Sequence, residues 1–559
     1  MGESESEDSE NEGSMGNVTR VVMRPAGHSG KAKKGHLCFD ASFECGNLGF
    51  VDLISQHEYD LFIRPDTCNP RVRMSFNFTV ENSKPDQRVI MNIINFSKKR
   101  NCFLYGMTPI VKSTSRPIWQ RMPNNNVFYH SSPYHNNNYV LSLAFNFDRE
   151  QDVYHFSFCY PYSYSKCQAY LDLLEKKNLP FFKREQLGLS LQKRRVDLLT
   201  ITDPKNMSPN GKVHVVFILA RIHPAASPAS FVCQGIIDFL ISNNPTAVSL
   251  REKIVFKVIP MLNPDGVYLG NFRCSSIGID LNRSWSRISK WLHPTLECTY
   301  SYIAALDQDK NIDLDFVMDI HAHSNLRGAF ICGNTYNDVY RYERHIVFPK
   351  LLSQHVLGYE NVHTVFNRDS NRAGSARRVL CDALKDSVNC YSLNVSFYGY
   401  HHSKNTPFKY YTEETYYRVG RNVVQSFAEY YTTTGVIVPT VKNADKQQHI
   451  SRTIWKYHEV SKSLRRRHSA PGTCYSQVSV IDLGDFRPMT METRRSRSYT
   501  RRREHGNRTW AGGQHTSSPS HNFLQHQQPS LSIIDFNMMA RGGLEQATAT
   551  RKRCNPSRT

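Results

Sequence analysis

The sequence predicts a small all-β sandwich, then an α/β domain with a mostly parallel mixed sheet, and finally a basic tail. Three observations carry this fold class. Apolar and polar residues alternate with period two over residues 36–163, apolar strands alternate with helical segments over 164–432, and the periodic pattern ends at 433. Period two is typical of strands with one buried face, whereas strands that alternate with helices indicate crossover connections and parallel pairing.

Composition indicates a protein of a reducing, aqueous compartment. The 559 residues suffice for two or three domains at roughly 150 residues each. Residues 1–35 open with the acidic run MGESESEDSENEG, which predicts disorder and lacks the apolar segment of a signal peptide. No apolar run reaches the ~18 residues that span a bilayer, and the 14 cysteines form no CxxC pair. We therefore expect free thiols, a cytoplasmic location and no membrane partner.

The β domain, 36–163, is predicted from short segments rich in aromatic and β-branched residues, separated by clusters of Asn, Pro, Asp and Ser. These segments are VRMSFNFTV (72–80), RVIMNIINF (88–96), YVLSLAFNF (139–147) and VYHFSFCY (153–160). Their alternation favours two sheets packed face to face.

The α/β domain, 164–432, begins where the periodicity changes from two to that of a helix. Helices are predicted at 165–178, 230–242 and 412–431, and strands at 212–220, 252–261, 314–320 and 388–397. Because these strands alternate with helices, we expect their carboxyl ends to share one edge of the sheet.

The tail, 433–559, is basic and rich in Ser, Gln and His, and its pattern predicts disorder. Residues 441–559 contain 21 Lys and Arg against 8 Asp and Glu, so they carry +13 of the net charge of +21. This charge favours an acidic partner. The tail has few aromatic residues for base stacking, which disfavours nucleic acid as that partner.

Polar residues follow several predicted strands, at the edge where ligands bind in open α/β sheets. His223 follows the first strand, in RIHPAASPASF, and the second runs into the segment 263–285, NPDGVYLGNFRCSSIGIDLNRSW. The third ends in DIHAHS, which contains His321, and the fourth contains Asn394. Each feature alone is also typical of an ordinary loop or a solvated surface, and it is their convergence that predicts a site.

The chain resembles the cytosolic carboxypeptidases, members of the zinc metallocarboxypeptidase superfamily. The resemblance covers about residues 36–432 and rests on long motifs in order. These are KKGHLCFDASFECGNLG, YDLFIRPDTCNPR, SFVCQGIIDFL, PMLNPDGVYLGN, DLNR, DIHAHS and SFYGY. It implies a metallocarboxypeptidase-like α/β domain, one zinc ion per chain and a peptidase that removes C-terminal glutamate.

The resemblance also identifies two positions where this sequence departs from the family. His223 and His321 match the two zinc-binding histidines, but the family's HPGE is HPAA here, so the third ligand position is Ala226. The family's general-base glutamate corresponds to Asn394, in YSLNVSF. A catalytic zinc normally has three protein ligands, and loss of a general base alone costs about 10²–10⁴ in rate. We therefore expect weakened zinc binding and impaired hydrolysis.

The residues that match the family's substrate-binding positions are retained. The resemblance implies that Arg273 polarises the scissile carbonyl and that Asn282 and Arg283 hold the terminal carboxylate. Arg377 or Arg378 would recognise an acidic side chain, although a solvated surface accounts equally well for this pair. Arginine suits these roles because it stays charged and pairs with carboxylates through two hydrogen bonds.

Three functions remain open from the sequence. The first is a zinc-dependent deglutamylase acting on acidic C-termini such as those of tubulin. The second is a pseudoenzyme that binds such tails without cutting them. The third is attachment to microtubules through the basic tail. Each agrees with a cytoplasmic protein associated with the cytoskeleton or centrioles.

Overall fold

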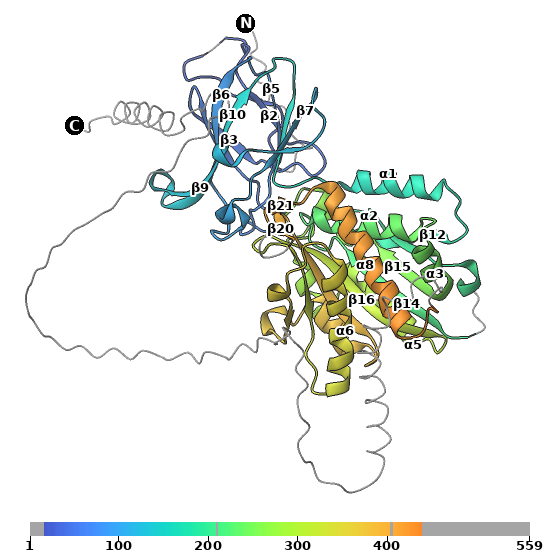
Figure 1. Cartoon of the computed structure of the whole chain (residues 1–559). Coiled ribbons are helices and arrows are strands. Elements are labelled where there is room, and N and C mark those ends of the chain that lie inside the picture. The colour runs from blue at the N-terminus through green and yellow to red at the C-terminus, as the bar shows by residue number, and fades with distance from the viewer. Residues whose placement is uncertain (1–15, 29, 208–210, 403–405, 439–559) are drawn as a thin grey trace, which may run out of the picture.

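The computed structural model describes residues 16–28, 30–207, 211–402 and 406–438, which form two adjoining domains (Figure 1). The β-sheet domain lies at one end of the α/β domain, close to the small β20–β21 hairpin, Gly399–His401 and Phe408–Tyr410. The predicted acidic run at the N-terminus and the predicted basic tail beyond Val438 lie outside the described residues.

The β domain consists of two sheets. The first has the order β1-β2-β5-β11-β7-β8, and all of its pairs are antiparallel. Its strands are β1 (Val21–Val22), β2 (Cys38–Asp40), β5 (Asn77–Glu81), β11 (Tyr154–Ser157), β7 (Ile110–Ser113) and β8 (Gln120–Arg121). The second has the order β3-β4-β6-β10-β9, with β4 and β6 parallel. It comprises β3 (Phe50–Ser55), β4 (Glu58–Phe62), β6 (Gln87–Ile93), β10 (Asn138–Phe147) and β9 (Val127–Ser132).

The inner faces of the two sheets form one core, which confirms the predicted sandwich. Phe39 of the first sheet lies with its ring centroid 5.4 Å from that of Tyr59 in the second. In β10, Leu141 and Leu143 are fully buried and both belong to this core. Residues two apart on a strand point to the same face, so the period of two in the sequence becomes an apolar layer between the sheets.

The sandwich begins earlier than the sequence indicated. Val21 and Val22 form β1 and pair with Phe39 and Cys38, and Val18 is buried in the core. The assignment of all of 1–35 to a disordered acidic terminus is therefore wrong for this segment. The apolar residues after position 17 add an edge strand, and the strongly acidic residues before them masked that signal.

The α/β domain contains a mixed sheet of eight strands in the order β12-β13-β15-β14-β16-β19-β17-β18. The strands are β12 (Phe182–Leu189), β13 (Arg195–Ile201), β15 (Ile254–Ile259), β14 (Val213–Ala220), β16 (Ile312–His323), β19 (Asn389–Ser396), β17 (Ala329–Gly333) and β18 (Val365–Phe366). The four central strands, β15, β14, β16 and β19, are parallel to one another, so their carboxyl ends share one edge as predicted. The outer strands β12, β13, β17 and β18 were not predicted.

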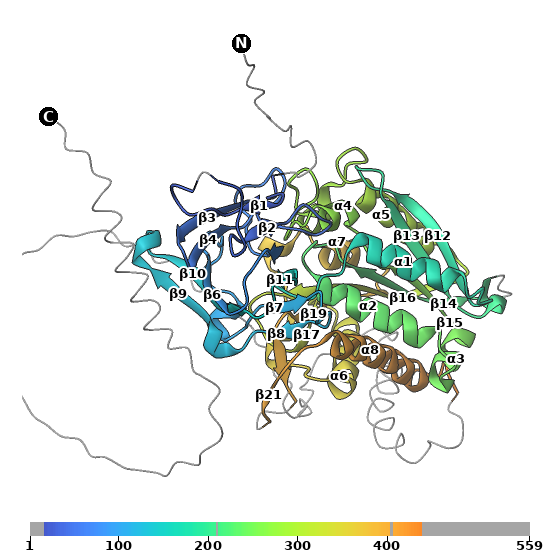
Figure 2. The ribbon, with the colours of Figure 1, turned by 90° about the horizontal axis from the view of Figure 1, so that it is seen from above.

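Helices cover both faces of this sheet (Figure 2). They are α1 (Tyr164–Glu175), α2 (Ser227–Leu240), α3 (Pro245–Lys253), α4 (Pro264–Tyr268), α5 (Pro294–Gln308), α6 (Val339–His355), α7 (Ala376–Ala383) and α8 (Glu413–Thr433). In β14, Val216 and Ile218 join the core shared with α2 and α8, while Val215 and Phe217 join the core beneath α5 and α7. Burial on both faces explains why the central strands read as continuous apolar runs. No helix in the described part of the chain is long and apolar enough to cross a membrane.

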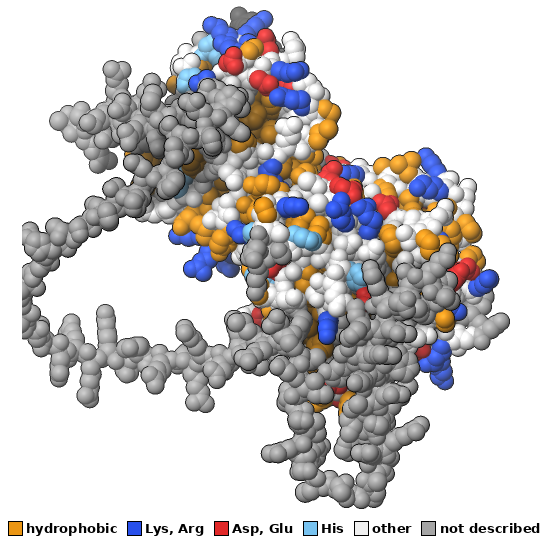
Figure 3. Space-filling model, viewed as in Figure 1, with side chains coloured by type: hydrophobic (Ala, Val, Ile, Leu, Met, Phe, Trp, Pro, Cys, Tyr) orange, Lys and Arg blue, Asp and Glu red, His pale blue; other side chains and the backbone are white. Residues whose placement is uncertain are grey.

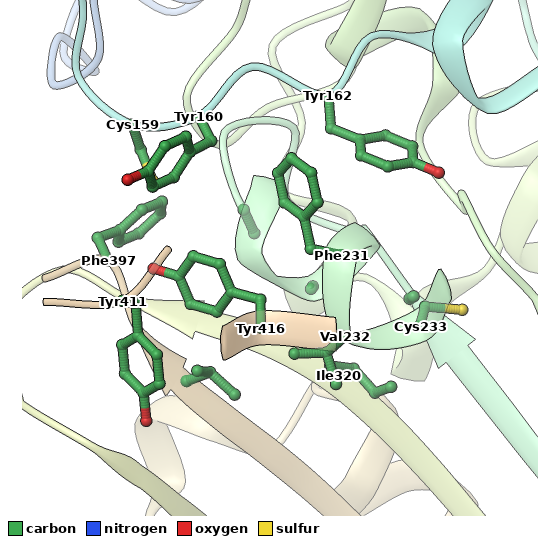
Figure 4. Packing of buried hydrophobic residues seen from close by; sticks show 14 of the residues in the cluster. Cys159, Tyr160, Tyr162, Phe231, Val232, Cys233, Ile320, Phe397, Tyr411 and Tyr416 are labelled. Atoms are coloured by element: carbon green, nitrogen blue, oxygen red, sulfur yellow. The ribbon is translucent and has the colours of Figure 1, made fainter. Parts of the chain in front are cut away.

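Apolar packing and polar anchors join the two domains. Figure 4 shows Tyr160 and Tyr162, which follow the last sandwich strand, on either side of Phe231 from α2. The ring centroids of Tyr162 and Phe231 lie 5.0 Å apart. Asp66 of the sandwich accepts hydrogen bonds from the backbone N–H groups of Phe272, Arg273 and Cys274, at 2.6 to 2.8 Å. The sandwich therefore fixes a loop at the edge of the α/β sheet where the site lies.

Candidate functional site

A cleft of about 280 Å³ opens at the carboxyl ends of β14, β16 and β19. Most of the residues predicted from the sequence meet there, together with one side chain from the sandwich. The lining consists of Lys98, His223, Ala225, Ala226, Phe272, Arg273, Asn282, Arg283, His321, Ala322, His323, Ser324, Asn325, Cys332, Arg372, Ser375, Arg377, Ser392, Asn394 and Phe397.

His223 and His321 form the centre of the cleft. Their ring centroids lie 5.2 Å apart, with the planes inclined at 39°. His223 lies just beyond β14 and His321 near the end of β16; because these neighbouring strands are parallel, they bring the two rings together. Two imidazoles at this separation are within reach of one metal ion.

Each imidazole is oriented by a carboxylate at Nε2. His223 Nε2 lies 3.1 Å from Asp280 Oδ1, and His321 Nε2 lies 2.5 Å from Asp319 Oδ2. Burial, followed by the charge of Arg273, lowers the pKa of His223 to about 4, so this ring is neutral at pH 7. With its proton on Nε2, His223 has its lone pair on Nδ1, and this nitrogen makes no hydrogen bond to a described residue.

The described residues do not complete a three-ligand zinc site. Ala226, where the sequence analysis expects the third ligand, lies in the cleft and precedes α2, and its methyl group cannot coordinate a metal. His323 shares the cleft because β16 continues through it, but its Nδ1 accepts hydrogen bonds from the N–H groups of Asn325 and Leu326. In the described part of the chain, no cluster of three His, Cys, Asp or Glu could hold a metal. The donor set therefore does not fit the zinc that the fold family implies.

Asn394 lies beside His321, on β19, where it is the register partner of that histidine, and it lines the same cleft as His223. Its Nδ2 lies 3.6 Å from Cys332 Sγ and 3.3 Å from the carbonyl oxygen of Ser392. A neutral amide does not accept a proton near pH 7, so Asn394 cannot act there as a general base.

The cleft lining is cationic. The lining includes five cations and no acidic side chain among the described residues: Lys98, Arg273, Arg283, Arg372 and Arg377. Two carboxylates lie just outside the lining, Asp280 paired with Arg273 and Asp369 paired with Arg372. By contrast, Lys and Arg are interspersed with Asp and Glu on the face seen in Figure 3. Burial, reinforced by neighbouring guanidinium groups, lowers the pKa of both Lys98 and Arg283. An anion bound among these cations would relieve their mutual repulsion.

Arg273 and Asn282 are held firmly in place. Arg273 Nε donates to Asp280 Oδ2 at 2.6 Å, so Asp280 links this arginine to His223. Asn282 accepts from the backbone N–H of Ala376 at 3.0 Å, and its Nδ2 lies 3.1 Å from His321 Nε2. The oxygen of Asn282 is thus engaged by the protein, and its amide nitrogen, which has two hydrogens and one contact, can still donate to a ligand.

The three remaining arginine candidates differ in their surroundings. Arg283 donates through Nη1 to the carbonyl oxygen of Asn282 and keeps its other nitrogens free to bind a ligand. Arg377 is buried at the base of the cleft, where it donates to Asn334 Oδ1 at 2.8 Å and to the carbonyl oxygen of Gly333. Arg378 does not line the cleft and lies 3.8 Å from Asp382 in an ion pair.

Sequence reasoning missed several residues of the site. Asp280 and Asp319 stand inside the motifs DLNR and DIHAHS, so their proximity to ligand-type residues was a usable signal. Arg372 lies a few residues before Arg377 and Arg378, the pair that the sequence analysis named. Lys98 gave no signal, because only the docking of the sandwich onto the α/β domain brings it to the cleft.

Comparison with known proteins agrees with this architecture. A profile of the zinc carboxypeptidase family matches residues 167–461, and a profile of the cytosolic carboxypeptidase N-terminal domain matches residues 39–158. The chain is 52% identical over 441 residues to cytosolic carboxypeptidase 6 of Homo sapiens, which covers 78% of this chain and 88% of that protein. It is 42% identical over 398 residues to cytosolic carboxypeptidase 6 of Caenorhabditis elegans, with 70% and 84% covered.

Solved structures show the same fold at low identity. A metallo-carboxypeptidase from Burkholderia cenocepacia aligns with a TM-score of 0.59 and 19% identity, over 71% of this chain and 99% of that one. A putative carboxypeptidase from Burkholderia mallei aligns with a TM-score of 0.60 at 19% identity, over 72% and 99%. With both domains matched in order, the chain belongs to the cytosolic carboxypeptidase family of zinc carboxypeptidases.

Proposed function

We propose that this chain binds glutamate-rich C-termini, such as the tails of tubulin, and releases little or no glutamate from them. The observation that carries the proposal is the composition of the cleft, which has five cationic side chains and no acidic one among the described residues. Hydrogen bonds to charged groups contribute about 1.5–3 kcal/mol each, so several carboxylates bound together would give useful affinity.

The terminal carboxylate of the ligand would lie against Arg283 and the amide nitrogen of Asn282. Lys98 and Arg372 would neutralise acidic side chains along the tail, and the buried Arg377 would hold the last one from the base of the cleft. The cations come from both domains, so the ligand would bridge them. This arrangement favours an extended, multiply charged peptide over a single free amino acid.

The chemical step is where this chain differs from an active peptidase of the family. Ala226 and Asn394 supply neither a third anionic metal ligand nor a proton acceptor, and we derive no hydrolytic step from the residues present. If the chain binds glutamylated tails without removing glutamate, its function is to recognise these tails. The names of the relatives, cytosolic carboxypeptidases, favour the cytoplasm as the place where such tails are met.

Equilibrium binding to a fluorescent peptide with a C-terminal glutamate run tests this proposal. We expect saturable binding that weakens with added salt, because the contacts are ionic. The same peptide with an amidated C-terminus should bind several-fold more weakly, and a lysine run should not bind. Equal affinity for the free-acid and amidated peptides would refute the role of Arg283 and Asn282.

A second candidate is a residual zinc-dependent deglutamylase, which the membership of the family favours. Metal analysis of the purified protein, together with mass spectrometry of the incubated peptide, separates the two. Stoichiometric zinc and a ladder of shortened peptides would support the enzyme. Unaltered peptide supports binding without cleavage.

A further inference from the structure

A second, smaller cavity of about 50 Å³ lies between the two domains, behind the loop that carries His223. Residues of the sandwich and of the α/β domain line it together. They include Cys45, Asn47, Asn77, Tyr162, Arg221 and Ser227. A single water needs about 10–15 Å³ of such volume, so the cavity has room for a small ligand.

Arg221 contributes the charge to this cavity. It is 3% exposed, and its backbone at the end of β14 has a φ of 58°, in the left-handed region that non-glycine residues seldom adopt. Nε donates to the carbonyl oxygen of Pro224 at 2.7 Å and Nη1 to Ser230 Oγ at 2.8 Å. Nη2 makes no hydrogen bond to any described residue, and no described carboxylate pairs with the guanidinium.

The polar groups around Arg221 cannot act as its counter-ion. Burial raises the pKa of the Cys45 thiol to about 12 and also raises that of Cys159, so both are neutral at pH 7. The amide oxygens are engaged: Asn47 Oδ1 accepts from the N–H of Arg64, and Asn77 Oδ1 contacts His155 Nε2. Arginine remains protonated at any physiological pH, so a nearly buried positive charge has no anionic partner among these groups.

A second source of positive potential faces the same cavity. Helix α2 spans 14 residues, and Ala226 before it supplies no side-chain cap. Ala225 and Ser227, at the beginning of this helix, both line the cavity. The N-terminus of a helix carries about half a positive charge, which favours an anion nearby. The N–H groups of Ala225, Ser227 and Ala229 are already bonded to carbonyl oxygens, so α2 contributes its dipole and not free donors.

We propose that the interdomain cavity is a binding site for a small monovalent inorganic anion of the size of chloride, held by Arg221 and favoured by the dipole of α2. A buried charge is costly unless it is paired, and an anion here would supply the missing partner. The site is separate from the cleft proposed for acidic C-termini, although Ala225 borders both. An anion bound here would stabilise the contact between the domains.

Bromide, which replaces chloride and scatters anomalously, locates the ion directly. Crystals of the full chain grown in sodium bromide should give an anomalous peak within hydrogen-bonding distance, roughly 3.5 Å, of Arg221 Nη2. A peak without anomalous signal, refined as ordered water only, would overturn the proposal. This measurement uses the unaltered protein, so it does not depend on whether any variant folds.

Anion-dependent stability provides the second test. At constant ionic strength, replacing gluconate, which is too large for the cavity, by chloride should lower the unfolding equilibrium constant about elevenfold at ten times the dissociation constant. The effect should saturate, disappear in Arg221→Met and persist in Arg251→Met. Arg251 is a matched control because it is also buried and donates to carbonyl oxygens, of Leu240 and Ser242, away from this cavity. Equal chloride dependence in Arg221→Met and the parent chain would refute the site.

Discussion

Asp66 of the sandwich accepts a hydrogen bond from the backbone N–H of Arg273, at 2.7 Å, across the domain boundary. The same carboxylate also receives the N–H groups of Phe272 and Cys274, and it is 2% exposed. Since Arg273 lines the cleft and is held to Asp280 at its other end, its position depends on both domains. The sandwich is therefore part of the proposed binding site and not only a neighbouring domain.

Replacing Asp66 by Asn should weaken binding of the glutamate peptide. An amide has one acceptor oxygen for three N–H groups, and each buried N–H left unsatisfied costs about 1–3 kcal/mol. We expect a loss of several-fold in affinity, measured by titration, and little further loss when Arg273→Met is already present. Strict additivity of the two changes would contradict the idea that Asp66 acts through Arg273.

Asp152→Asn is the matched control for this variant. Asp152 likewise accepts hydrogen bonds, from Thr114 Oγ1 and from Ser115, but it does so within the sandwich and away from the cleft. The Asp152→Asn variant should lower the stability of the fold and leave the affinity for the glutamate peptide unchanged.

Arg283→Ala should reduce affinity for the glutamate peptide about tenfold or more, because one charge-assisted pair is worth at least ~1.4 kcal/mol. The amidated peptide should lose much less, since it lacks the carboxylate that Arg283 would hold. Arg378→Ala should have no effect, because that side chain pairs with Asp382 outside the cleft. A loss in Arg378→Ala equal to that in Arg283→Ala would show that the acidic peptide binds elsewhere.

Lys98→Ala should weaken binding and flatten its dependence on salt, because one cation from the sandwich is removed from the cleft. Lys99→Ala is the matched control, because Lys99 is adjacent in sequence to Lys98 but does not line the cleft. The comparison requires only binding curves at low and high salt. Identical curves for the two variants would show that the sandwich contributes no charge to recognition.

His345 provides a prediction for pH and stability. Burial lowers its pKa to about 3, and its Nε2 accepts the backbone N–H of Asn334 at 3.0 Å. Between about pH 6.5 and pH 3, His345 is protonated in the unfolded chain but neutral in the folded chain. The unfolding free energy should therefore fall as the pH drops below about 6.5, by up to ~1.4 kcal/mol per pH unit for this residue.

Denaturant unfolding of His345→Gln checks this dependence. Glutamine keeps an acceptor but does not titrate, so the loss of stability between about pH 6.5 and pH 5 should shrink by about 2 kcal/mol. His57→Gln, at an exposed position, should retain the pH dependence of the parent chain. An unchanged slope in His345→Gln would contradict a neutral, buried His345.

The central sheet and the pair of histidines were predictable because local patterns define them. β14 is a long apolar run, whereas β16 and β19 combine apolar residues with Asp, His, Asn and Ser. Parallel pairing then places His223, His321 and Asn394 at one edge. The outer strands were not predictable from the sequence. β12 and β13 have the mixed sequences FKREQLGL and RVDLLTI, and their pairing depends on the sheet already formed. Lys98 and Asp66 could not be assigned to the site from the sequence either, because only the contact between the two domains brings them there.

Arg377 illustrates why residue type alone did not identify a role. Two adjacent arginines look alike in the sequence, yet they begin helix α7 and point to different sides of it. One is bonded to Gly333 and Asn334 beneath the cleft, and the other lies toward Asp382. Only the packing of α7 on the sheet separates them.

Introducing the two carboxylates that the resemblance implies, at Ala226 and Asn394, tests whether the other residues of the cleft can support hydrolysis. The double variant Ala226→Glu with Asn394→Glu should gain about one zinc per chain and measurable release of glutamate. Each single variant should gain less zinc or less activity. Ala226→Glu alone lacks the general base, and Asn394→Glu alone lacks the third metal ligand. Metal analysis and mass spectrometry of the peptide provide the readouts.

The most direct test of the central claim is a long incubation of the unaltered chain, supplied with zinc, with its bound glutamate peptide, followed by mass spectrometry. Binding without hydrolysis predicts that the peptide saturates the protein and is recovered at full length. Loss of successive C-terminal glutamates, abolished by a chelator and at a rate above that of a protein-free control, would contradict it.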